Sequence, residues 1–146
     1  MLAPRSHQEA LAMPLPTSLG FAGAFALLNL WLAYRCVRIR VNGPGGVGDL
    51  GIPELLARMR AHANFVEYTP FVLILMVLLE YAGGSRAWLQ GLGAAYIVAR
   101  VVHAFGMERP KFTMQFIGAL VTWLVLLALA VWAICLAIHA EGRGGI

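Results

Sequence analysis

Two long stretches without a charged side chain constrain this chain more than any other feature. No Asp, Glu, Lys or Arg occurs in the 25 residues 10–34 or in the 29 residues 112–140. A helix that crosses the hydrocarbon core of a bilayer needs about 20 mostly apolar residues, so each stretch is long enough. Strands of a membrane barrel would alternate over segments of about ten residues, and no such period is sustained here. The two stretches therefore predict membrane-spanning helices.

The composition excludes the other broad classes of protein. Hydrophobic residues make up 60% of the 146 residues and charged residues 12%, where a typical soluble protein has about 25% charged residues. A chain of this length cannot hide so much apolar surface from water, which argues against a soluble domain. A disordered chain would need low hydrophobicity and high charge. At roughly 150 residues per domain, the length predicts a single domain.

Two further spans lie between the uncharged stretches, at residues 61–82 and 87–105. Glu67 lies inside the first of them and Arg100 inside the second. We therefore predict an all-α integral membrane domain over residues 1–146, with helices near residues 15–38, 55–82, 87–107 and 112–139. The N-terminal stretch lacks a clear small-residue cleavage site, so we expect a short tail that leads into a retained first helix.

The basic residues predict how the helices are oriented in the membrane. Eight of them belong to the loops, with their flanks, that join the first helix to the second and the third to the fourth; three lie on the opposite side. The first group is Arg35, Arg38, Arg40, Arg58, Arg60, Arg100, Arg109 and Lys111, and the second is Arg5, Arg86 and Arg143. Since cytoplasmic loops carry the excess of Lys and Arg, we expect both termini outside the cytoplasm.

Two features resemble functional motifs without their usual context. Residues 43–48 read GPGGVG, but a dinucleotide-binding glycine motif has meaning only between a strand and a helix. We interpret this segment as a flexible loop. Cys36 and Cys135 have no metal-like spacing, so we expect no metal site.

No basic stripe is interleaved with aromatic residues, which argues against a nucleic-acid partner.

Polar residues cluster in the second predicted helix. Arg60, Asn64 and Glu67 fall within about 60° of one another around a helix, with Tyr68 close beside them and His62 pointing elsewhere. Arg100 and His103 form a second polar pair in the third helix. Small residues at Gly91, Ala95 and Ala99 share a face of that helix, as is typical of close helix packing in membranes.

The polar cluster has more than one explanation. Placing Glu67 inside an apolar span costs at least a few kcal/mol, so such a residue faces a partner or a water-filled cavity. Glu67 and Arg100 alone could be counter-ions that hold two helices together. A proton or ion pathway is disfavoured because the fourth helix does not continue the polar track. A pocket for a polar, partly anionic ligand explains the whole set, since arginine binds carboxylates and Glu67 can receive an ammonium group. Glutathione is one ligand with these groups, but the residue chemistry alone does not select it.

The motif of the second helix is Arg60-x-His62-x-Asn64-x-x-Glu67-Tyr68-x-Pro70, and the third helix contains Ala99-Arg100-x-x-His103. These residues resemble the MAPEG family of membrane-associated proteins in eicosanoid and glutathione metabolism. The chain looks closest to the small bacterial branch of that family and is similar to microsomal glutathione transferase. The resemblance covers residues 19–138. It implies a four-helix bundle assembled as a homotrimer, in a bacterial inner membrane, with glutathione bound as co-substrate between neighbouring subunits near the cytoplasmic side.

The resemblance also assigns roles to individual residues. The positions that it implies for glutathione binding are Arg60, His62, Asn64, Glu67, Tyr68, Arg100 and His103. We expect the last two to be the catalytic residues. Possible additional basic contacts are Arg35, Arg38 and Arg109.

The sequence departs from the family pattern where the thiol would be activated. Met107 replaces a tyrosine of the well-studied eukaryotic members, and Met114 and Phe116 lie where those members place a thiolate-stabilising arginine. A thiol with a pKa of about 8.5 is mostly protonated at neutral pH and needs a nearby positive charge or donor. Two functions stay open. The preferred one is a glutathione transferase or peroxidase acting on apolar electrophiles or lipid hydroperoxides from the bilayer. The alternative is a glutathione- or lipid-binding membrane protein without efficient thiol catalysis.

The predicted orientation can be tested with a cysteine introduced at Gly46, in a variant that lacks Cys36 and Cys135. The excess of basic residues places residues 43–48 in the cytoplasm, so this cysteine should resist an impermeant thiol reagent in intact cells. Ready labelling would reverse the orientation.

Overall fold

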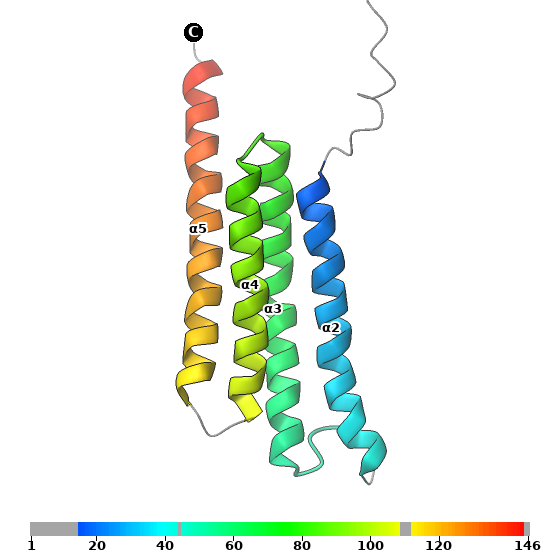
Figure 1. The fold of residues 1–146 in the computed structure, drawn as a ribbon. Helices are drawn as coiled ribbons and strands as arrows, with labels where there is room; N and C mark the ends of the chain where they lie inside the picture. The colour runs from blue at the N-terminus through cyan, green and yellow to red at the C-terminus, as the bar shows by residue number, and fades with distance from the viewer. Residues whose placement is uncertain (1–14, 44, 109–111, 145–146) are drawn as a thin grey trace, which may run out of the picture.

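The computed structural model describes residues 15–43, 45–108 and 112–144, with side chains to residue 140. These residues form four helices and no strand: α2 (Pro16–Asn42), α3 (Pro53–Tyr81), α4 (Arg86–Glu108) and α5 (Phe112–Gly144). The helices alternate in direction and pack side by side as a bundle (Figure 1). This architecture confirms the predicted all-α fold.

The bundle has the dimensions and composition of a membrane domain. Helices α2, α3 and the first 29 residues of α5 are long and apolar enough to cross a membrane. Because α3 and α5 run in the same direction, α4 must return across the bilayer between them (Figure 1). The start of α2 and the end of α5 consequently lie at the same end of the bundle, as four passes require.

The helix boundaries differ slightly from those predicted. Helix α2 continues to Asn42, four residues past the predicted end, and α5 continues to Gly144, five residues past it. In α2 the extension carries Arg40 in its last turn, where a cation interacts favourably with the helix dipole. Both α2 and α3 begin with proline, which needs no hydrogen-bond acceptor at the first helical position.

The glycine-rich segment after α2 is a loop, as predicted. Gly45, Gly46 and Gly48 all have positive φ, a conformation that side-chain-bearing residues rarely adopt. The segment joins two helices, and the element directly before it is the helix α2. It therefore lacks the context in which a glycine motif binds a dinucleotide.

Helices α4 and α5 approach each other most closely at two glycines. A Cβ atom on Gly118 would lie 2.6 Å from the Cβ of His103, and one on Gly106 would lie 2.4 Å from the backbone nitrogen of Gln115. Neither position has room for a side chain. The fully buried Tyr96 of α4 packs edge-on against Phe25 of α2 and in a tilted arrangement against Phe65 of α3, so it connects α2 and α3 to the α4–α5 pair.

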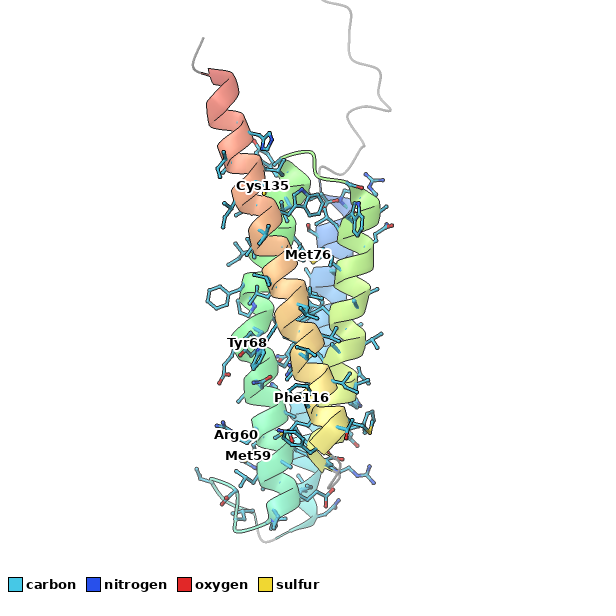
Figure 2. The ribbon with its side chains drawn as sticks, turned by 90° about the vertical axis from the view of Figure 1, so that its left-hand side faces the viewer. Met59, Arg60, Tyr68, Met76, Phe116 and Cys135 are labelled. Carbon is cyan, nitrogen blue, oxygen red and sulfur yellow. The ribbon has the colours of Figure 1, made fainter. Side chains whose placement is uncertain are left out.

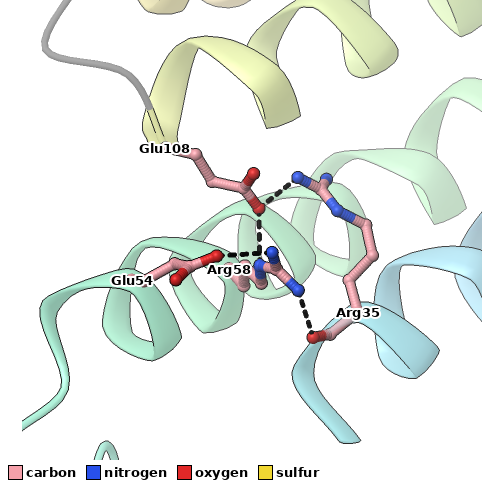
Figure 3. A network of polar contacts seen from close by, with 4 residues as sticks. All are labelled: Arg35, Glu54, Arg58 and Glu108. Atoms are coloured by element: carbon pink, nitrogen blue, oxygen red, sulfur yellow. Dashed lines mark hydrogen bonds and ion pairs between the residues drawn. The ribbon is translucent and has the colours of Figure 1, made fainter. Parts of the chain in front are cut away.

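An ion-pair network joins three helices at the end that we expect to be cytoplasmic (Figure 3). Glu108, at the end of α4, forms ion pairs with Arg35 of α2 and with Arg58 of α3, whose Nε lies 2.7 Å from the Glu108 carboxylate. The Nη1 group of Arg58 also donates to the backbone carbonyl of Arg35 at 2.8 Å, and its Nη2 pairs with the exposed Glu54 at 2.5 Å. The Arg35 guanidinium is additionally covered by the rings of Trp31 and Phe105.

At the opposite end, a carboxylate of α3 caps α2. The backbone N–H groups of Thr17 and Ser18 donate to the two Glu80 carboxylate oxygens at 2.9 and 2.7 Å. The first N–H groups of a helix have no partner within the helix, so a carboxylate there satisfies them and complements the helix dipole. The rotation of α3 relative to α2 is thus fixed at both ends.

The Glu108 network generates a prediction about stability. Replacing Glu108 with Ala leaves two largely buried arginines without their shared carboxylate, so the free energy of unfolding should fall by about 3 kcal/mol or more. Glu54→Ala is the matched control, because its side chain is 56% exposed, and it should cost less than about 1 kcal/mol. Unfolding titrations in detergent micelles measure both. Equal losses would show that Glu108 is no more central than a surface residue.

Candidate functional site

The predicted polar stripe lies on the outer face of α3. Arg60 and Glu67 are exposed in the single chain, and Asn64 is half-buried. The core-facing Phe65 is 2% exposed, and at about 100° per residue Arg60 and Glu67 point roughly 140° and 160° away from it. Figure 2 labels Arg60 near the start of α3 and Tyr68 further along the same helix. Charged groups therefore project outward from a helix that crosses the membrane.

Tyr68 lies where this stripe meets α5. Its side chain is half-buried, and its hydroxyl oxygen accepts a hydrogen bond of 3.1 Å from the indole Nε1 of Trp123. Tyr68 therefore connects the outer face of α3 to the neighbouring helix α5.

His62 faces the other side of α3. Its Nε2 lies 2.8 Å from Oδ1 of Asn29 on α2, so His62 donates to the amide oxygen and its Nδ1 is left for another partner. It lines an open groove of 570 Å³ between α2 and α3, whose other walls are Ala33, Cys36, Val37, Arg40, Met59, Ala63, Val66 and Glu67. Glu67 thus lies at the border between the groove and the outer stripe. No three metal-ligating side chains come together within the described residues.

Arg100 and His103 lie inside the bundle, between α4 and α5. Arg100 is 1% exposed, and its Nη1 donates to the hydroxyl of Thr122 at 3.4 Å. Its Nη2 lies 3.5 Å from His103 Nδ1, and since a guanidinium only donates, His103 must accept there and carry its proton on Nε2. The Arg100 Nε is buried without a partner. This guanidinium is weakly held, and none of the ion pairs of the described residues includes it.

The counter-ion explanation of Glu67 and Arg100 is wrong for this structure. Within the described residues, ion pairs join Arg35 and Arg58 to Glu54 and Glu108, and none joins Glu67 to Arg100. The reason is orientation, because Glu67 projects away from the core whereas Arg100 projects into it.

Two of the additional basic contacts that we predicted, Arg35 and Arg38, lie apart from the stripe. Arg35 is buried in the ion-pair network, and Arg38 is exposed at a second hollow formed by the end of α2 and the start of α3. Arg40, which was not among the predicted contacts, lines the same groove as His62. Arg109 and Lys111 lie outside the described residues.

The positions that depart from the family pattern carry no positive charge. Met107 and Met114 are half-buried, and Phe116 is half exposed on α5. Neither thioether nor phenyl groups can stabilise a thiolate by charge. Any activation must come from other residues.

Three polar partners were missed by the sequence analysis: Asn29, Thr122 and Trp123. Asn29 and Thr122 lie within the two long uncharged stretches, where a polar side chain signals that it has a hydrogen-bond partner. Nothing in the sequence points to Trp123, because its contact with Tyr68 depends on how α3 and α5 are rotated.

The weakly held guanidinium predicts an unusual response to mutation. Arg100→Met replaces a buried charge with an apolar side chain, so the free energy of unfolding should stay unchanged or rise by about 1–4 kcal/mol. Arg35→Met is the control and should destabilise, because it leaves Glu108 without one partner. Unfolding titrations distinguish the two. Marked destabilisation by Arg100→Met would reveal a strong partner of Arg100.

Comparison with known proteins identifies the family of the chain. The profile of the MAPEG family matches residues 18–135. Inner membrane protein YecN of Escherichia coli (strain K12) is 31% identical over 107 residues, which cover 73% of this chain and 82% of that protein. YecN of Escherichia coli O6:H1 matches equally. The matched region contains all of the polar positions described above from Asn29 to Trp123, and the chain belongs to the MAPEG family.

Proposed function

We propose that this protein binds glutathione in the membrane and activates the thiol of glutathione to attack apolar electrophiles or lipid hydroperoxides. The observation that carries the proposal is the outward polar stripe of Arg60, Asn64 and Glu67 on a membrane-spanning helix of a MAPEG protein. The relatives called YecN are named for their location and not for an activity. The proposed activity is therefore argued from the site residues.

The chemistry of the stripe suits a tripeptide with two carboxylates and an ammonium group. Arg60 would bind a carboxylate through its two-pronged guanidinium, and Glu67 would receive the ammonium group. Asn64 both donates and accepts, as a peptide group requires. Tyr68 would add a hydroxyl donor at the edge of the stripe next to α5.

The separation of the site residues supports a site shared between copies of the chain. Arg60 and Asn64 do not line the groove that holds His62 on the α2 side of α3, and Glu67 borders both surfaces. The groove is open, so one copy of the chain does not enclose a ligand that touches both surfaces. In a ring of identical subunits, the stripe of one protomer meets a different surface of its neighbour, so both surfaces contribute to each site. We therefore propose a homotrimer, with the groove bearing His62 and Arg40 completing the stripe.

Thiol activation is assigned to Arg100 and His103. The guanidinium makes only long hydrogen bonds of 3.4 and 3.5 Å, and its Nε has no partner, so little holds it in its buried position. A rotation toward the stripe would bring a positive charge to the thiolate, and the Nε2–H of His103 would be available as a donor. The thiol proton passes to water. In conjugation the thiolate sulfur forms a bond to the electrophilic atom, and the leaving group departs with the electron pair. With a hydroperoxide the sulfur attacks the terminal oxygen, the O–O bond breaks and the alkoxide takes up a proton; a second glutathione thiol then converts the sulfenic acid to a disulfide and water.

The burial of Arg100 and His103 favours a second function. Arg100 and His103 are 1% and 5% exposed, and uncharged residues occupy positions 107, 114 and 116. If Arg100 stays buried, the protein would bind glutathione or a lipid without efficient thiol chemistry. Turnover distinguishes the two functions: a transferase should exceed the rate in solvent, and a binding protein should not.

The variant Glu67→Gln tests the proposed site. It preserves shape and removes the charge that would receive the ammonium group, so glutathione affinity should fall about tenfold to a hundredfold. The free energy of unfolding should not fall, because Glu67 is exposed in the single chain and has no ion pair within the described residues. Glu54→Gln is the control and should bind glutathione normally. Unchanged affinity in Glu67→Gln, measured by calorimetric titration, would remove the stripe from the site.

A further inference from the structure

The hydroxyl of Tyr68 is held by a specific donor. Tyr68, at the edge of the stripe, has a hydrogen bond to another helix, with its hydroxyl oxygen 3.1 Å from the Nε1 of Trp123. No such bond is made by the stripe residues Arg60, Asn64 and Glu67 within the described part of the chain. An indole N–H can only donate, so the Tyr68 oxygen is the acceptor. The phenolic proton is therefore free for a third group.

The depth of Trp123 in the membrane makes this contact unusual. Trp123 lies eleven residues after the start of α5 at Phe112, or about 17 Å along the helix, which is near the middle of a hydrocarbon core of about 30 Å. Tryptophan that anchors a protein lies instead at the membrane surface. The side chain of Trp123 is 54% exposed in the protomer, so packing in the core does not explain it either.

The surroundings make the bond persistent. Hydrocarbon beside the exposed face of Trp123 offers its indole no competing acceptor, and an unpaired N–H there is costly. The hydrogen of a phenol lies close to the ring plane and points to one of two sides of the oxygen. An indole donor on one side excludes the hydrogen from that side, so the O–H is directed toward the other.

We propose that Trp123 is a positioning residue of the glutathione site, which orients the Tyr68 hydroxyl so that it donates to an anionic group of the bound tripeptide. This inference rests on the proposed function. Trp123 acts through Tyr68 and need not touch the ligand itself. Accepting the indole bond also polarises the Tyr68 O–H and makes it a stronger donor, because hydrogen bonds in a chain reinforce one another.

A double-mutant cycle tests the proposal, with glutathione as the probe and calorimetric titration of the assembled protein in detergent as the measurement. Trp123→Phe removes the donor and keeps an aromatic ring, and it should weaken glutathione binding about fivefold. Tyr68→Phe should weaken it by at least as much. Because Trp123 acts only through Tyr68, the double variant should bind no more weakly than Tyr68→Phe alone.

The control is Trp132→Phe, on the same helix, which has no indole hydrogen bond in the described part of the chain and should leave the affinity unchanged. If Trp123→Phe does not assemble, incorporation of 3-benzothienylalanine at position 123 removes the N–H and keeps the shape of the indole. The same fivefold loss is expected.

The outcomes separate this inference from the proposed function. Additive losses in the double variant, or full affinity in Trp123→Phe, would overturn the positioning role while glutathione binding by the unaltered protein stands. A loss of affinity in Trp132→Phe as large as that in Trp123→Phe would point to general packing and would also overturn it. Absence of glutathione binding by the unaltered protein would overturn both.

Discussion

The architecture depends on one constraint: charged side chains stand on the outer face of a helix that crosses hydrocarbon. Arg60 lies close enough to the start of α3 for its long side chain to reach the membrane surface, whereas Glu67 lies about 21 Å along the helix. Exposing that carboxylate to lipid would cost at least a few kcal/mol. Within the described residues no ion pair neutralises it. We therefore infer that a second protein surface covers the stripe, and a ligand with an ammonium group would satisfy the carboxylate.

The polar contacts inside the protomer hold α3 in the rotation that turns this stripe outward. Glu80 caps α2 at one end of the bundle, and Glu108 binds the arginines of α2 and α3 at the other. Between them, the Tyr96 hydroxyl lies 2.8 Å from that of Thr69, and Asn29 accepts from His62. Since these bonds link α3 to its neighbours along its whole length, a rotation that buried Glu67 would break several of them. The contacts inside the chain organise the bundle around its core and leave the polar stripe on the outside.

The fold could be predicted from the sequence more completely than the site. Uninterrupted apolar stretches define spanning helices, because hydrocarbon leaves the chain few alternatives. Spacing also placed Arg60, Asn64 and Glu67 on one stripe correctly. It could not show which way the stripe faces, because the direction of the core depends on contacts between helices. For the same reason the Glu67–Arg100 pair was wrong, and the Glu108 network, Asn29 and Trp123 were missed. The end of α2 at Asn42 was missed because its last turn lies beyond the apolar stretch on which the boundary was based.

The central claim is that glutathione binds between the stripe of one protomer and the groove of another, and mixed assemblies test it most directly. Asn64→Ala damages the stripe and His62→Ala damages the groove, so neither variant should bind glutathione well alone. If each site draws its two surfaces from different protomers, random co-assembly in equal amounts should restore about one quarter of the sites. Calorimetric titration of the co-expressed, co-purified variants measures the number of restored sites. Recovery near that fraction is the result that we expect. A mixture that binds no more glutathione than the average of the separate variants would contradict a shared site.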